Sequence, residues 1–161
     1  MGKTRFFKWL LIACFIPMYT ASGQTITQLE KKNGFRDARF GASVKSFRNL
    51  VLTEQEGNTK YYRRKTDVMT MKGVEFADIT YAFYKDRLSH VFITLNGVEN
   101  SREFVTLLES LYGEGERLYP WVESFDNVLE WNGENITLTY GEIANTKEGI
   151  VHYYSNTTKF N

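Results

Sequence analysis

The sequence predicts an α+β fold in which two helix-plus-antiparallel-strand units form one sheet with both helices on one face. Three observations lead to this prediction. Aromatic residues make up 16% of the 161-residue chain, and ten of them are tyrosines, which favour half-buried sheets. Alternating apolar patterns end at turn residues in several segments. A helical apolar pattern precedes strand-like segments twice, near Gly41 and near Asn100.

The first 23 residues have the three-part layout of a secretory signal peptide. Three basic residues precede an apolar stretch over residues 9–19, and small residues occupy positions 21–23. The apolar stretch has about half the residues needed to cross a bilayer. The sequence therefore predicts export to the periplasm or the cell exterior, cleavage after Gly23, and no transmembrane segment in the mature chain.

A second exit route is attachment of lipid to Cys14, because Leu11-Ile12-Ala13-Cys14 resembles a bacterial lipobox. The context favours cleavage at Gly23 instead. Only five apolar residues separate Lys8 from Cys14, and apolar residues follow Cys14 where a lipoprotein normally has a polar tether. Cys14 is the only cysteine, so cleavage after Gly23 leaves a chain without disulfide or thiol chemistry.

The charge of the chain indicates no nucleic acid or anionic membrane as a partner. Cleavage after Gly23 removes three of the 20 basic residues and none of the 19 acidic residues, so the mature chain is nearly neutral. The segment Lys60-Tyr61-Tyr62-Arg63-Arg64-Lys65 combines basic and aromatic residues, as single-strand binders do. Export makes that partner a poor match, and we interpret the segment as a charged edge strand.

We expect residues 24–34 to form a flexible leader, because they are polar and lack a repeating apolar face. A single α+β domain then covers residues 35–161. The segment 35–40 alternates around two aromatic residues and predicts a short strand. Ser43 predicts the N-cap of a helix of about two turns. The apolar residues at helical spacing after this cap are Val44, Phe47 and Val51.

Residues 59–65 and 74–96 predict the next strands, and the second segment predicts a hairpin. A two-residue turn at positions 86–87 divides its apolar residues between both faces, whereas an odd-length loop over positions 85–87 gathers them on one face. Because a one-residue slip turns every side chain over, we favour the second register. Its core face holds Ile79, Tyr81, Phe83, Val91, Ile93 and Leu95. Its other face holds Thr80, Ala82, Tyr84, Leu88, His90 and Phe92.

Residues 101–112 predict a second helix. Asn100 fits an N-cap, Glu103 completes a capping box, and Gly113 ends the segment. The apolar stripe of this helix consists of Phe104, Leu107, Leu108 and Leu111.

A strand near residues 118–125, a hairpin with a turn at Asn132-Gly133 and a final strand over residues 149–155 complete the prediction. One face of the hairpin holds Leu129, Trp131, Ile136, Leu138 and Tyr140, and the other holds Glu130, Thr137 and Thr139. Asn135 and Asn156 match the glycosylation sequon, which we interpret as chance because the signal is of bacterial type.

Residues with catalytic or metal-binding chemistry are sparse. His90 and His152 lie in predicted strands, and no third metal ligand is evident, so we expect structural histidines and no cofactor. Four acidic residues lie near two tryptophans and allow an alternative function as a small secreted hydrolase. These residues are Glu123, Asp126, Glu130, Glu134, Trp121 and Trp131. The alternation of the hairpin instead makes Glu130 and Glu134 solvent-side residues.

Two short motifs carry a resemblance to known proteins. Phe40-Gly41-x-Ser43 opens the first predicted helix, and Leu111-Tyr112-Gly113 closes the second before a Trp-bearing hairpin. In these features the chain resembles small exported bacterial proteins of the β-lactamase-inhibitor-like and SmpA/OmlA-like type. It lacks the cysteines that some of those proteins carry. The resemblance implies a protein-binding or envelope-associated module and transfers no functional residue.

The sequence therefore leads to a non-catalytic binding or envelope module, with a small hydrolase as the alternative. We expect the sheet face opposite the helices to bind, through Tyr84, His90 and Phe92, because exposed aromatic residues offer contact area at low entropy cost. The expected partner is another envelope protein or a second copy of this chain.

Overall fold

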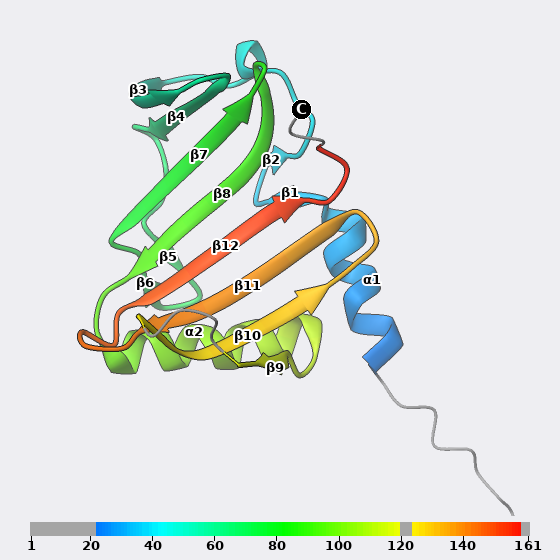
Figure 1. Cartoon of the computed structure of the whole chain (residues 1–161), viewed down its shortest axis with the longest axis vertical. Helices are drawn as coiled ribbons and strands as arrows, with labels where there is room; N and C mark the ends of the chain where they lie inside the picture. Colours follow the sequence, from blue (N-terminus) through cyan, green and yellow to red (C-terminus); the bar gives the residue numbers. More distant parts are fainter. Residues whose placement is uncertain (1–21, 120–123, 159–161) are drawn as a thin grey trace, which may run out of the picture.

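The computed structural model describes residues 22–119 and 124–158 (Figure 1). The α+β prediction is confirmed, because helices α1 (Ser22–Lys32) and α2 (Val98–Tyr112) accompany an eight-stranded antiparallel sheet. The predicted signal peptide lies, up to residue 21, outside the described residues. Within the described part of the chain, neither helix is long and apolar enough to span a membrane.

The eight-stranded sheet is built from four strands of the earlier part of the chain and four strands of the later part. Its strands are β3 (Leu50–Glu56), β4 (Thr59–Arg64), β7 (Asp78–Tyr84), β8 (Arg87–Leu95), β9 (Glu116–Leu118), β10 (Phe125–Asn132), β11 (Ile136–Ile143) and β12 (Gly149–Ser155). Their order is β3-β4-β7-β8-β12-β11-β10-β9, so the earlier and later halves of the sheet meet where β8 pairs with β12.

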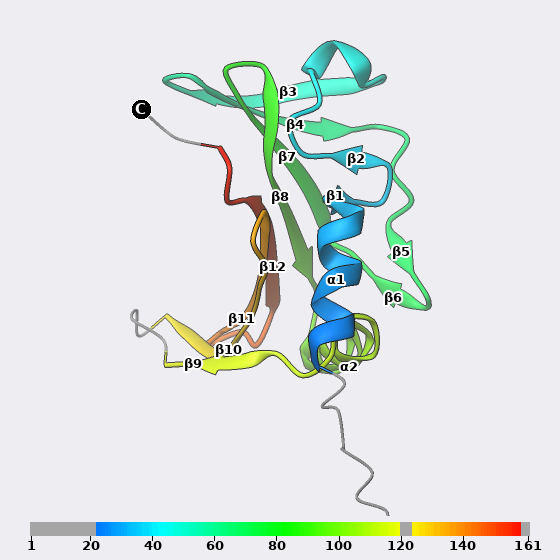
Figure 2. The same cartoon turned by 90° about the vertical axis from the view of Figure 1, so that its right-hand side faces the viewer.

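Both helices lie on one side of this sheet (Figure 2). Two short hairpins, β1 (Gly34–Phe35) with β2 (Ala38–Arg39) and β5 (Thr70–Met71) with β6 (Val74–Glu75), lie on the same side. The core fills the space between these elements and the sheet. The largest fully buried side chains are Trp131, Tyr81, Tyr140, Tyr153, Phe35, Phe83 and Phe104. We call the other side of the sheet, on which none of the described helices packs, the open face.

The N-terminal segment differs from the sequence prediction. A flexible leader was expected over residues 24–34, whereas α1 covers most of that range and ends where Asn33 adopts a positive φ of 44°. The reason is tertiary: Leu29 is fully buried, and α1 contacts α2. The expected strand over residues 35–40 is also interrupted, because Arg36 takes a left-handed conformation and turns the chain into the β1–β2 hairpin.

The first predicted helix is a single turn of 3₁₀ helix over Val44–Ser46. Ser43 caps it as expected, since its side chain accepts a hydrogen bond from the Lys45 amide. The helix does not continue because the following residues form β3 and pair with β4. Val51 therefore lies on a strand with 40% of its surface exposed, instead of on a helix.

Helix α2 is formed as predicted except at its start. It begins at Val98 with Gly97 at the N-cap, and Gly113 ends it with a φ of 82°. Asn100 is not the cap: its side chain bonds both the backbone N–H and the C=O of Glu75, and so joins α2 to β6. The fully or nearly fully buried residues of the helix are Ser101, Phe104, Leu108 and Tyr112, with Leu107 and Leu111 packed beside them.

The β7–β8 hairpin has the predicted core register but a different turn. Ile79 pairs with Ile93 and Tyr81 with Val91, as expected. The loop is a two-residue turn at Lys85 and Asp86, both with positive φ, and a register shift follows in β8. Beyond the shift, the two strands pair in the register that the expected three-residue loop would give. Before the shift, the side chain of Leu88 points into the core and is fully buried.

The β10–β11 hairpin buries the predicted face, with Leu129 opposite Tyr140 and Trp131 opposite Leu138. Its turn lies at residues 134–135, two positions later than predicted, and the Gly133 N–H donates to the Ile136 carbonyl. Glu30 on α1 sets this position by accepting hydrogen bonds from Asn135. A β-carbon at residue 133 would lie 2.9 Å from the Ile136 carbonyl oxygen and would overlap with the Glu30 carboxylate, so glycine allows this close approach.

Candidate functional site

The open face carries a strip of half-buried aromatic and imidazole side chains. Tyr84, His90 and Phe92, the three binding residues predicted from the sequence, all lie on it and are partly exposed. Two other residues assigned to this face do not belong to an exposed strip. Leu88 is in the core because of the shift in β8, and Ala82 is fully buried on the sheet. Strand pairing adds two residues that the sequence prediction did not include, His152 and Tyr154 of β12.

His90 and His152 form a hydrogen-bonded imidazole pair at the centre of this strip. His90 Nδ1 lies 2.8 Å from His152 Nε2, and the ring centroids are 5.0 Å apart with 24° between the ring planes. The centroid separation equals the nitrogen separation plus the two ring radii, so the rings meet edge to edge. A nitrogen of each ring is thus directed at the other ring, which leaves no room for a shared metal ion between them.

Aromatic rings surround the histidine pair. Phe92 stacks on His152 with centroids 4.3 Å apart and 14° between planes, and Tyr154 lies 4.8 Å from His152. Burial lowers the pKa of His90 below its usual value of 6.5. Burial, and then the neighbouring His90, lower the pKa of His152 to about 3. Both imidazoles are therefore neutral at pH 7, and this part of the strip is uncharged.

A shallow cavity of about 250 Å³ adjoins the strip on the open face. Its walls are mostly apolar and come from β8, β10, β11 and β12. The lining residues include Phe92, Phe125, Val128, Thr139, Gly141, Ile150 and His152. Gly141 is important because a β-carbon there would lie 3.1 Å from the Phe125 ring. A register shift between Asp126 and Leu129 places Phe125 and Val128 around this glycine.

Negative charge lies beside the cavity. Thr139, which lines it, pairs across the strands with Glu130, and Glu130 lies opposite Glu116 of β9. Burial, and then the charge of Glu116, raise the pKa of Glu130 above its usual value. Within the described residues, neither carboxylate forms an ion pair, whereas nearby Asp126 is paired with Lys147 at 2.5 Å.

Among the described residues, the carboxylates considered for a hydrolase are not brought together with Trp131. Trp131 is 1% exposed on the core side and donates from Nε1 to the Gly113 carbonyl, whereas Glu130 faces the other side of the sheet. Trp121 and Glu123 lie outside the described residues. In the described ranges, no group of three or more His, Cys, Asp or Glu side chains is placed to hold a metal ion.

The basic segment over residues 60–65 is not an edge strand, because β4 pairs with β3 on one side and β7 on the other. Two of its basic side chains form ion pairs with carboxylates of the same chain: Lys60 with Asp86, and Arg63 with Asp78. The edge strand on this side of the sheet is β3, which carries acidic residues near its end.

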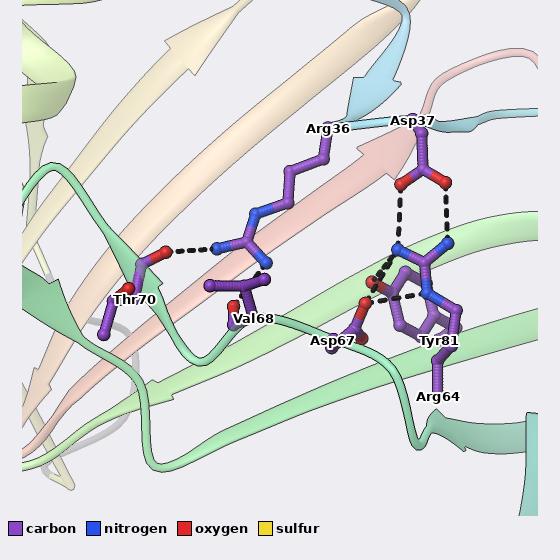
Figure 3. Close-up of polar contacts among 7 residues, drawn as sticks. All are labelled: Arg36, Asp37, Arg64, Asp67, Val68, Thr70 and Tyr81. Atoms are coloured by element: carbon purple, nitrogen blue, oxygen red, sulfur yellow. Dashed lines mark hydrogen bonds and ion pairs between the residues drawn. The ribbon is translucent and has the colours of Figure 1, made fainter.

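Arg64 is the centre of the polar cluster in Figure 3. Its guanidinium contacts both carboxylate oxygens of Asp37, at 2.7 and 2.8 Å, and a carboxylate oxygen of Asp67 at 2.7 Å. Arg36, which lies beside Asp37 in the turn of the β1–β2 hairpin, donates to the carbonyls of Val68 and Thr70. These contacts join the β1–β2 hairpin and the loop before β5 to the sheet. We interpret this cluster as structural, because carboxylates and carbonyls of this chain accept the bonds from its cations.

Both sequon asparagines are engaged within the fold. The Asn135 side-chain amide donates to Glu30, and that of Asn156 donates to the Gly133 carbonyl.

Comparisons of the chain with protein-family models, curated proteins and solved structures return no match.

Proposed function

We propose that this chain is an exported, non-catalytic binding module whose open face holds a partner protein. The observation that carries the proposal is the strip formed by Tyr84, His90, Phe92, His152 and Tyr154, which is half-buried on a face that the described helices leave uncovered. Aromatic residues with a polar tip are enriched at protein interfaces because they bury a large apolar area and keep a hydrogen-bonding group.

The geometry favours binding over catalysis on this face. The two imidazoles bond each other, and their lowered pKa values keep them neutral at pH 7. His152 of β12 pairs with Thr139 of β11, which in turn pairs with Glu130 of β10. The carboxylate of Glu130 is therefore separated from His152 by the intervening strand. An acid and a base in reach of one substrate atom are therefore not assembled from these groups.

We include in this proposal the two-unit arrangement and the resemblance to envelope proteins. Strands β3, β4, β7 and β8 lie in one half of the sheet and β9 to β12 in the other, which we interpret as two helix-plus-strand units that join edge to edge. We interpret the 3₁₀ turn at Val44–Ser46 as the reduced helix of the first unit. In this interpretation the preferred partner is another envelope protein, and a second copy of the chain is an outcome of the test.

The test of the binding face measures which proteins of a cell-envelope extract are captured by the mature protein. The parent and two variants serve as bait. The variant Tyr84→Ala, Phe92→Ala removes two rings of the strip, whereas Leu52→Ala changes a residue of β3 that is 51% exposed. We expect a partner to be retained by the parent and by Leu52→Ala and lost with the double variant. A folded double variant that retains every partner would contradict the proposal.

Export is tested by the intact mass of the protein recovered from the secreting cell. A chain that begins at Gln24 supports cleavage after Gly23. A product with lipid on Cys14 supports the anchored form, and a product that retains Trp9 contradicts export by cleavage.

A further inference from the structure

We infer that the cavity around Gly141 is an anchor site for one apolar side chain of the partner, flanked by a basic residue of that partner. This inference rests on the proposed function of the open face and names the chemistry of the group that is recognised. The shape of the cavity, its walls and the charges next to it support this inference.

The shape of the cavity depends on Gly141 and on a register shift in β10. Gly141 lies within β11, where glycine weakens a strand and often marks close approach of another group. The register shift in β10 brings Phe125 next to it, so that a β-carbon at residue 141 would press on the ring. The resulting space of about 250 Å³ is suited to one aromatic or branched side chain.

The walls of the cavity are apolar and continuous with the aromatic strip. Phe92 and His152 belong to both, since they stack on each other in the strip and line the cavity. Ile150 and Val128 complete the apolar lining. A partner that covers the strip therefore reaches the cavity without leaving the open face, and a buried anchor surrounded by aromatic contacts is the usual form of a binding hot spot.

The charges beside the cavity select against an anion. Glu130 and Glu116 lie opposite each other on neighbouring strands, and they form no ion pair within the described residues. Like charges at this spacing repel each other. A basic group of the partner placed here relieves that repulsion, whereas a carboxylate increases it.

Three probes that share one ring system but differ in charge test these arguments on the full mature chain: indole, tryptamine and indole-3-acetate. We expect tryptamine to bind most tightly and indole-3-acetate at least about five-fold more weakly than indole, because of the two carboxylates. Amide NMR shifts on titration should cluster at Gly141 and Ile150. The variant Glu130→Gln should reduce the difference between the charged probes.

A matched pair of variants separates filling of the cavity from the general effect of an added aromatic ring. Thr139→Phe fills the cavity, whereas Thr106→Phe makes the same change at an exposed position of α2, on the other side of the sheet. We expect the filled variant to weaken indole binding at least about ten-fold and the control to leave it nearly unchanged. If Thr139→Phe does not fold, shift mapping on the parent decides, and shifts scattered over the sheet overturn the inference.

Capture of the partner distinguishes failure of the anchor from failure of the proposed function. Loss of the partner with Thr139→Phe, but not with Thr106→Phe, supports the anchor. If Thr139→Phe retains the partner while Tyr84→Ala, outside the cavity, loses it, the open face binds but the anchor inference is wrong. If indole binds and the partner is indifferent to cavity filling, the cavity is a site for a free small molecule and the inference is likewise overturned.

Discussion

The carboxylate of Glu30 accepts hydrogen bonds from the backbone and side-chain amides of Asn135, each at 2.9 Å, across 105 residues of sequence. It also accepts a longer bond from the Ile136 amide. One residue of α1 thereby satisfies the donors of the β10–β11 turn. This relationship explains both why α1 is fixed against the sheet and why the turn lies later than the Asn132-Gly133 pair predicts.

Replacing Glu30 by alanine should lower the free energy of unfolding by about 1 kcal/mol or more, because the amides of the turn lose a charged acceptor. Burial raises the pKa of Glu30, but the bonds from Asn135 and the neighbouring amides outweigh it and lower the pKa below 4.5 overall. The stabilisation is therefore present above pH 4.5 and is lost as the pH falls through the lowered pKa. Denaturant titrations at pH 7 and in acid measure it. Glu134→Ala in the same turn is the control and should change stability little.

Arg64→Ala should cost about 3 to 5 kcal/mol, because it leaves the carboxylate of Asp67, whose side chain is 4% exposed, without its cation. The adjacent substitution Arg63→Ala breaks a more exposed pair with Asp78 and should cost less than about 1 kcal/mol. Thermal denaturation of the two variants provides the comparison. Equal costs would mean that the cluster in Figure 3 does not join the hairpin and loop to the sheet.

Asn100→Ala should cost about 1 to 2 kcal/mol through loss of two bonds to Glu75, and not through loss of a helix cap. The two explanations differ in location. Loss of the bonds loosens the β5–β6 hairpin, so faster hydrogen exchange is expected there. Faster exchange confined to the first turn of α2 would favour the capping interpretation instead.

The histidine pair should make the protein sensitive to acid below neutral pH. Because folding lowers the pKa of both imidazoles, the unfolded chain binds more protons as the pH falls below 6.5. Stability is complete above pH 6.5 and should decrease toward the lowered pKa values, by up to about 1.4 kcal/mol per pH unit for each imidazole. Denaturant titrations of the parent and of His152→Gln between pH 7.5 and 4.5 should differ in slope, the variant being less steep. Imidazole NMR shifts of His152 that titrate near pH 6.5 would falsify this account.

Glu130→Gln should stabilise the protein at pH 7 by less than about 1 kcal/mol, because it removes repulsion from Glu116. Folding raises the pKa of Glu130, so its charge is unfavourable at neutral pH and the cost disappears as the carboxyl is protonated in acid. Melting temperatures at pH 7 and pH 4 should therefore show a gain only at pH 7. A stabilising substitution beside the cavity is consistent with a carboxylate retained for binding.

Local patterns in the sequence determined the α+β class, the buried faces of both hairpins and the stripe of α2. These features follow from periodicities of two and 3.6 residues, which depend on nearby side chains alone. The same alternation assigned Tyr84, His90 and Phe92 to one face of the sheet. It did not reveal the shift that buries Leu88, because a register shift changes the alternation without a distinctive residue.

Only the tertiary structure decided what lies next to these residues. His90 meets His152 because β8 pairs with β12 across 62 residues, and no local pattern specifies which strands become neighbours. The helix over residues 22–32 depends on one buried leucine and on contacts with α2, so its polar sequence alone resembled a leader. The cavity at Gly141 likewise requires Phe125 from another strand. Long-range packing selects these contacts from many that the local preferences allow, and the candidate site is built from them.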